Sequence, residues 1–158
     1  MDLFLYEDLE EIYLKENYIC SIPKWFMGLS NLKFIHLSGN NLTALPEELY
    51  LLENLEFLDV SQNKLTEIPD TIGLVLSLQR LNLSDNQLTE IPPEIGNLKY
   101  LEDLNVSKNQ LKRLPLQLSE CSRLSELNLS DNSEIWHIPE RISNLHTLQS
   151  LSADRKFY

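Results

Sequence analysis

The sequence predicts an α/β solenoid of short repeats, with a curved parallel β-sheet on its concave face and short helical or 3₁₀ segments and loops on its convex face. Two observations carry this prediction. An asparagine recurs every 23 residues along the 158-residue chain, and a fixed set of apolar positions surrounds each copy. The recurring residues are Asn17, Asn40, Asn63, Asn86, Asn109 and Asn132.

A strand is predicted first in each copy, in the segment before the asparagine. Apolar residues alternate there, as at Leu81 and Leu83, which is the period of a half-buried strand. One copy cannot bury its leucines alone. Stacked copies would pair their strands in parallel at roughly 4.8 Å per repeat and share one continuous core.

A turn is predicted next, at the asparagine itself. Its side chain can bond the backbone N–H and C=O groups that the turn leaves unpaired, so we predict a structural role for all six copies. A proline follows six residues later in the first five copies, as Pro92 follows Asn86. Apolar residues then recur at intervals of three (Ile95, Leu98, Leu101), which predicts a short helical or 3₁₀ segment that begins near the proline.

A single domain is predicted over residues 1–158, because no linker-like or low-complexity stretch divides the chain. It comprises a partial repeat at 1–8, six repeats at 9–31, 32–54, 55–77, 78–100, 101–123 and 124–147, and a partial repeat at 148–158.

Two departures from the pattern concern the C-terminal part. The sixth copy has one extra residue between Asn132 and Pro139, so its loop should bulge and push Trp136 outward. Lys156 stands where a seventh asparagine is expected. Neither end carries an obvious capping module, which favours an excerpt of a longer array over ends that meet a partner.

Composition restricts the classes of partner. A net charge of −11 argues against nucleic acid, and no apolar run approaches the ~20 residues that span a bilayer, so we expect no membrane insertion. The acidic N-terminal segment does not resemble a signal peptide, and Cys20 and Cys121 do not form a disulfide framework. The chain is predicted to be cytoplasmic.

The sequence offers no catalytic, metal or cofactor site. His36, His137 and His146 show no metal-ligand spacing, and no glycine-rich phosphate loop is present. The serine that recurs two residues before each asparagine from Asn40 onward is interpreted as a structural column. We therefore predict a protein that is not an enzyme and binds no cofactor.

The repeat L-x-x-L/I-x-L/V-x-x-N-x-L/I resembles the leucine-rich repeat family over essentially the whole chain. The 23-residue form that ends in x-L-P-x-x-I/L-x-x-L is similar to the intracellular class of Ras-pathway scaffolds, Ras suppressor and the Scribble and Erbin proteins. This resemblance implies protein ligands bound on the concave face, often small GTPases or signalling enzymes.

Candidate partner-binding residues flank the inward apolar positions of the strands, where side chains face the concave surface. The first three copies place aromatic side chains there, whereas later copies place small polar and acidic ones. Adjacent strands lie only about 5 Å apart, so the aromatic residues should form one patch. The predicted partner-binding residues are Tyr13, Phe34, His36, Phe57, Asp59, Arg80, Asp103 and Glu126.

These observations predict a non-catalytic scaffold or adaptor in intracellular signalling. Its protein partner should offer an aliphatic or aromatic anchor beside a basic segment. Two alternatives remain open at this stage, namely the substrate-recruiting segment of a larger enzyme and a fragment of an extracellular receptor built from the same repeat.

Overall fold

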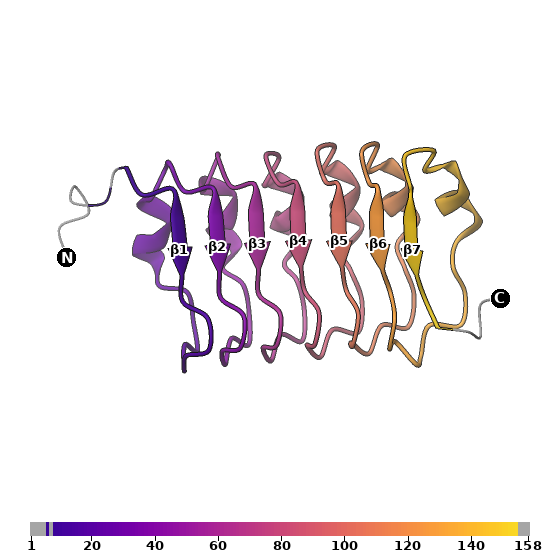
Figure 1. The fold of residues 1–158 in the computed structure, drawn as a ribbon, viewed down its shortest axis with the longest axis horizontal. Coiled ribbons are helices and arrows are strands. Elements are labelled where there is room, and N and C mark those ends of the chain that lie inside the picture. The colour runs from indigo at the N-terminus through magenta and orange to yellow at the C-terminus, as the bar shows by residue number, and fades with distance from the viewer. Residues whose placement is uncertain (1–5, 7, 155–158) are drawn as a thin grey trace.

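The computed structural model describes residues 6 and 8–154, so the prediction about Lys156 lies outside the described residues. Seven three-residue strands form one parallel sheet in chain order (Figure 1). They are β1 Glu11–Tyr13, β2 Phe34–His36, β3 Phe57–Asp59, β4 Arg80–Asn82, β5 Asp103–Asn105, β6 Glu126–Asn128 and β7 Ser150–Ser152. The predicted α/β solenoid with a parallel sheet is confirmed.

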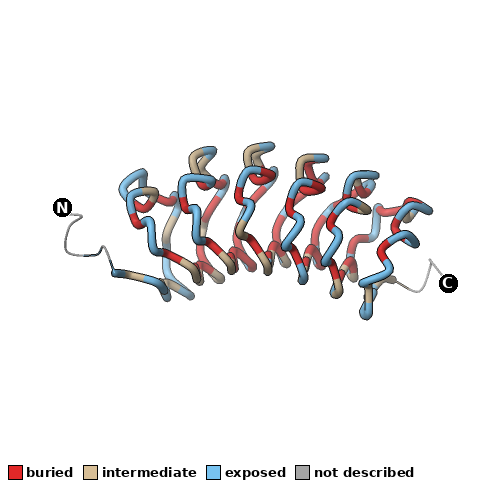
Figure 2. Tube along the Cα trace, turned by 90° about the horizontal axis from the view of Figure 1, so that it is seen from above, coloured by how far each residue is buried: buried red, intermediate tan, exposed pale blue. Residues whose placement is uncertain are grey.

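A 3₁₀ helix follows each of the first six strands, on the opposite side of the repeats from the sheet (Figures 1 and 2). The helices are η2 Lys24–Gly28, η3 Glu47–Leu51, η4 Asp70–Leu74, η5 Pro93–Asn97, η6 Leu116–Glu120 and η7 Glu140–Asn144. Each is preceded by a proline with φ between −56° and −73°, and all of these prolines except Pro139 are in the extended region. Proline suits this place because its fixed φ leads into a helical turn and it has no N–H to leave unpaired.

The core lies between the sheet and the layer of 3₁₀ helices. The central residues of β3 to β6, such as Leu81 and Leu104, are fully buried, and Cys121 lies among the buried leucines. The row of repeats bends slightly, with the strands on the inner side (Figure 2). Burial decreases at the last strand: Leu151 is 37% exposed, whereas Leu127, its partner in β6, is 1% exposed.

The asparagines tie each repeat to the one before it. The amide nitrogen of Asn86 donates to the carbonyl of Leu83 at 3.0 Å and to that of Val60, in the preceding repeat, at 3.0 Å. Its Oδ1 accepts the N–H of Leu65 at 2.9 Å. Equivalent bonds, to residues at the same spacings, are made by Asn40, Asn63, Asn109 and Asn132.

Asn17 differs from the other five. Its side chain is exposed and donates only to the carbonyls of Leu14 and Lys15 in its own turn. The other asparagines each bridge two repeats and are buried. The shared sequence position therefore gives two different environments.

The extra residue of the sixth copy appears as a change of register. Strands β1 to β6 pair with partners 23 residues along the chain, whereas Glu126 of β6 pairs with Ser150, 24 residues along. Trp136, in the loop that takes up this residue, is exposed as predicted. Its ring lies 5.6 Å from that of His137.

Candidate protein-binding face

The strand register arranges the outward side chains of the sheet in two columns, which together we call the strand face. The first column contains Glu11, Phe34, Phe57, Arg80, Asp103, Glu126 and Ser150. The second contains Tyr13, His36, Asp59, Asn82, Asn105, Asn128 and Ser152. Because every strand is in register, a side chain's neighbours across the sheet are read directly from these columns.

Four side chains on consecutive strands form a continuous stack, which we call the aromatic array. The ring of Tyr13 lies parallel to that of His36, with 4.4 Å between centroids and 10° between planes. The His36 ring in turn lies 4.8 Å from Phe57, and the guanidinium of Arg80 lies 5.0 Å from the Phe57 centroid. Since such ring pairs contribute about 0.5–1.5 kcal/mol each, the array is held in one arrangement before any partner arrives.

Polar neighbours fix the protonation states within the aromatic array. The Tyr13 hydroxyl donates to Oε2 of Glu11 at 2.8 Å, and this bond raises the pKa of Tyr13. Burial, and after it the nearby Lys15 ammonium, lowers the pKa of His36 below its ordinary 6.5. The imidazole is therefore neutral at pH 7, and its buried Nδ1 has no hydrogen-bond partner among the described residues. The aromatic array thus presents three uncharged rings, with the Arg80 guanidinium at one end.

Phe34 and Asp59 fill the remaining predicted positions in this half of the strand face. Phe34 is half-buried and pairs in register with Phe57, which widens the apolar surface. Asp59 is only 6% exposed, because it accepts the hydroxyl of Ser61 at 2.7 Å and lies 3.7 Å from the Lys15 ammonium. The carboxylate of Asp59 is thus engaged within the protein, and its part in partner binding stays a prediction.

The second half of the strand face contains a polar hollow of about 240 Å³. Asp103 and Glu126 are register neighbours on its wall, and Arg80 closes it on the side of the aromatic array. Burial raises the pKa of Asp103, as does the Glu126 charge, while Arg80 acts in the opposite direction. A cationic group of a partner would meet two adjacent carboxylates here.

The other residues of this hollow are mostly amides and hydroxyls. The Oδ1 atoms of Asn82, Asn105 and Asn128 each accept the N–H of the serine two residues later, at 3.1 Å. Ser150 and Ser152 of β7 also line the hollow. The sequence did not predict their part, because the incomplete seventh copy is shifted by one residue relative to the repeat.

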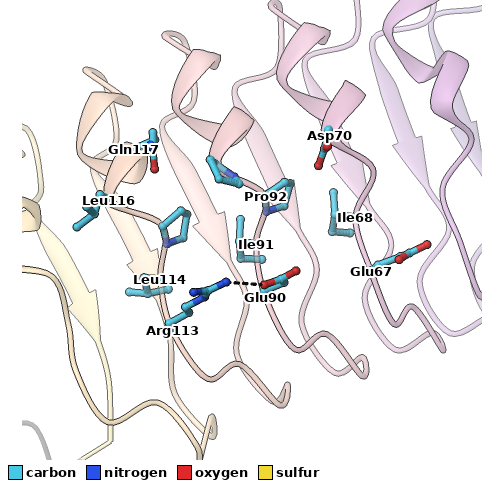
Figure 3. A pocket seen from close by; sticks show the side chains of 12 residues that line it. Glu67, Ile68, Asp70, Glu90, Ile91, Pro92, Arg113, Leu114, Leu116 and Gln117 are labelled. Atoms are coloured by element: carbon cyan, nitrogen blue, oxygen red, sulfur yellow. Dashed lines mark hydrogen bonds and ion pairs between the residues drawn. The ribbon is translucent and has the colours of Figure 1, made fainter.

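A larger hollow, of about 480 Å³, lies away from the strand face, along the segments that lead into η4, η5 and η6 (Figure 3). Its walls include Ile68, Ile91 and Leu114, which are the same repeat position in three consecutive copies. Arg113 reaches across to Glu90, with 3.3 Å between Nη2 and Oε2. We interpret it as the groove that stacked copies leave between them, and the strand face as the better candidate for binding.

Neither a metal-binding group nor a membrane-spanning helix is found among the described residues. No three histidine, cysteine, aspartate or glutamate side chains are grouped so that they could hold a metal ion within residues 6 and 8–154. In the same part of the chain, no helix has the length and apolarity needed to cross a lipid bilayer.

Family models identify the repeat. The model described as leucine rich repeat matches residues 7–65 and 36–88, and the model described as leucine-rich repeat region matches residues 70–156. The chain belongs to the leucine-rich repeat family. This family commonly mediates protein–protein interactions, and the narrower resemblance to Ras-pathway scaffolds stays a prediction.

Solved leucine-rich repeat structures share the fold. A leucine-rich repeat protein of Leptospira interrogans is 31% identical, with a TM-score of 0.85, over 94% of this chain and 39% of its own. The Arabidopsis receptor kinase HAESA, solved with the peptide hormone IDA and the co-receptor SERK1, is 32% identical, with a TM-score of 0.79, over 88% of this chain and 25% of the matched chain.

YopM from Yersinia enterocolitica is 28% identical, with a TM-score of 0.72, over 92% of this chain and 28% of its own. The chain therefore spans between 25% and 39% of the length of these three solved chains. Comparison with curated protein sequences found no match.

Proposed function

We propose that this leucine-rich repeat chain is a non-catalytic scaffold or adaptor that binds a protein partner on its strand face. The aromatic array is the observation that carries the proposal. Tyr13, His36, Phe57 and Arg80 belong to four consecutive strands, and their side chains stack without a gap. Tyrosine, phenylalanine and arginine are enriched in the buried centres of protein interfaces.

The array serves no evident need of the fold. Strands β4 to β6 have small polar side chains in the second column, Asn82, Asn105 and Asn128, and are paired as well as β1 to β3. The core is buried beneath β2 to β6, in both halves, and only the first copy, with Ile12 of β1, is partly buried. Aromatic side chains at these positions are therefore best explained by what they contact outside the chain.

The two halves of the strand face together define the partner's chemistry. An aliphatic or aromatic anchor fits against Phe34 and Phe57, and a basic segment beside it fits the hollow flanked by Asp103 and Glu126. By family resemblance, we propose a small GTPase or another signalling enzyme as the class of partner. The chain's net charge of −11 favours a partner with a basic surface.

The cysteines support a cytoplasmic location. Cys20 is exposed and Cys121 is buried, and both are free thiols. Burial raises the pKa of Cys121 to about 11, so that thiol stays protonated and unreactive. Free thiols of this kind are typical of proteins in reducing compartments.

Affinity capture followed by binding measurement tests the proposal. The wild type and the Phe34→Ala/Phe57→Ala variant are used as baits in the same cell lysate, with Trp25→Ala on the convex side as a matched aromatic truncation. The partner should be retained by the wild type and by Trp25→Ala, and lost from the double variant. Retention by the double variant together with loss from Trp25→Ala would assign binding to the convex side instead.

A further inference from the structure

Three exposed leucines lie together on the convex side, and we call them the leucine patch. Leu51, Leu74 and Leu76 are 46%, 53% and 58% exposed. Leu51 and Leu74 end the neighbouring helices η3 and η4, and Leu76 lies two residues beyond η4. Leu51 and Leu74 occupy equivalent positions of η3 and η4, which pack against each other, so the three leucines belong to two adjoining repeats.

The leucine patch is confined to two repeats. At the positions of Leu51 and Leu74 the other copies have small or polar residues, namely Gly28, Asn97, Glu120 and Asn144. At the position of Leu76 they have Ser30, Glu53, Lys99, Ser122 and His146. The fold therefore does not require an apolar side chain at either position, and clustered exposed leucines are typical of an interaction site.

Acidic side chains border the leucine patch. Glu53 occupies the Leu76 position in the preceding repeat, and Asp70 begins η4. Glu94 lies directly against Gly73, the residue before Leu74, so closely that a Cβ on Gly73 would collide with the Glu94 carbonyl. One carboxylate oxygen of Glu94 is buried and accepts no hydrogen bond within the part of the chain that the structure describes.

The cation in this region is already engaged. Lys99 occupies the Leu76 position in the next repeat, but its ammonium donates to the carbonyls of Gly96 at 2.7 Å and Glu120 at 3.0 Å. It also lies 3.7 Å from the Glu120 carboxylate. The Lys99 charge is thus directed toward the following repeat, and the surroundings of the leucine patch remain acidic.

We infer that the leucine patch is a second docking surface, distinct from the strand face, for an amphipathic helix with leucine-like side chains flanked by lysine or arginine. Leu51 and Leu74 occupy equivalent positions in consecutive repeats, so the apolar face of a helix lying across η3 and η4 could contact both. A second copy of this chain is a poor occupant, because it would bring Glu53, Asp70 and Glu94 against the same acids. An anionic membrane surface is disfavoured for the same reason.

Synthetic peptides of about 18 residues, long enough for roughly five helical turns, test this inference. The probe has leucines on one face and lysines beside them, and its matched control has glutamates in place of the lysines. Fluorescence anisotropy measures the binding of each peptide to the wild type and to Leu51→Asn/Leu74→Asn/Leu76→Ser. These replacements are residues that other copies already have at the same positions, so the variant should fold, and its thermal unfolding is measured as a check.

The lysine peptide should bind the wild type at least about tenfold more tightly than the triple variant, which corresponds to about 1.4 kcal/mol. The glutamate peptide should bind neither. Because the strand face is proposed to take a similar chemistry, the comparison is repeated in the Phe34→Ala/Phe57→Ala background. The tenfold difference between the intact and the replaced leucine patch should persist there, so that failure at the strand face and failure at the leucine patch are told apart.

Three results would overturn the inference. One is equal binding of the lysine peptide to wild type and triple variant, or no binding to either. Another is loss of binding only in the Phe34→Ala/Phe57→Ala variant. The third is a wild-type dimer in sedimentation, or wild-type binding to anionic phospholipid vesicles, that the triple variant abolishes, since the occupant would then be a second copy or a membrane.

Discussion

The two halves of the strand face share one backbone and differ in what they present. Over β1 to β4, side chains stack as rings and desolvate one another, so that His36 stays neutral. Over β4 to β6, amides and carboxylates surround a hollow in which Asp103 holds its proton more readily than usual. From the second copy onward, buried apolar side chains and bridging asparagines recur beneath both halves. A repeat of this kind can therefore change its surface chemistry from one copy to the next while its fold stays constant.

The largest expected effect concerns the apolar half. Truncating Phe34 and Phe57 together to alanine should weaken partner binding by about 2–4 kcal/mol, as the loss of buried aromatic anchors does. Calorimetric titration against the captured partner measures this. The free energy of unfolding should change by much less, because both rings lie outside the core. An unchanged affinity would mean that the aromatic half is not the anchor site.

A change beneath both halves should show the reverse pattern. Asn86→Ala should lower the free energy of unfolding by about 1–3 kcal/mol, because it leaves the carbonyl of Val60 and the N–H of Leu65 without their buried partner. Partner affinity should not change.

Asn17→Ala is the matched control for Asn86→Ala. Its side chain is exposed and bonds only within its own turn, so it should cost a few tenths of a kcal/mol, within the range of ordinary surface substitutions. Urea unfolding of both variants measures the difference. Equal losses at the two sites would mean that the bridge between repeats contributes nothing.

Much of this architecture follows from the sequence, because the repeat constrains itself. Few folds are compatible with a 23-residue period, a strand with alternating leucines and a proline before each helical turn. The structure has the predicted parallel sheet. The difference between Asn17 and Asn86 was not predictable in the same way. The difference depends on whether groups of a preceding repeat reach the asparagine, as those of Val60 and Leu65 reach Asn86. The pattern within one copy does not show this.

For the strand face, the sequence predicted which residues are on the surface but not the contacts between their side chains. The sequence placed Tyr13, His36 and Phe57 on one face, but it could not show that their rings stack or that Asp59 is withdrawn by Ser61 and Lys15. Such contacts depend on side-chain rotamers, which the repeat does not determine.

The left-handed residue before five of the asparagines shows a similar limit. Glu16, Gln62, Asp85, Lys108 and Asp131 have φ between 52° and 59°. In the sequence, the glycine at this position of the second copy, Gly39, indicated a left-handed residue, and its φ is 69°.

A smaller effect is expected in the acidic half. Replacing Asp103 and Glu126 with lysine should slow association with a basic partner roughly tenfold and weaken its dependence on salt, because these charges steer the encounter more than they hold the complex. Stopped-flow measurements at two salt concentrations separate the association rate from the dissociation rate. A change confined to dissociation would mean that the carboxylates contact the partner as buried pairs.

The smallest expected effect is the stability contributed by Asp103 alone. Its pKa in the folded state is raised above the ordinary 3.8, so the folded protein binds more protons than the unfolded chain as pH rises through this range. Ionisation of Asp103 therefore costs stability above the folded pKa and costs none below 3.8. Asp103→Asn should accordingly stabilise the protein at pH 7, by a few tenths of a kcal/mol because the site is partly solvated, and should have no such effect at pH 3.

Glu126→Gln tests the cause of this shift. Burial is the largest contribution to the raised pKa of Asp103, and the Glu126 charge adds to it, so removal of that charge should lower the Asp103 pKa without restoring its ordinary value. Arg80→Gln should raise the same pKa, since the guanidinium favours the ionised carboxylate. NMR titration of the Asp103 carboxyl measures both changes. If neither variant moves the pKa, the acidic half is not the coupled electrostatic site that its register suggests, and it differs from the aromatic half in polarity alone.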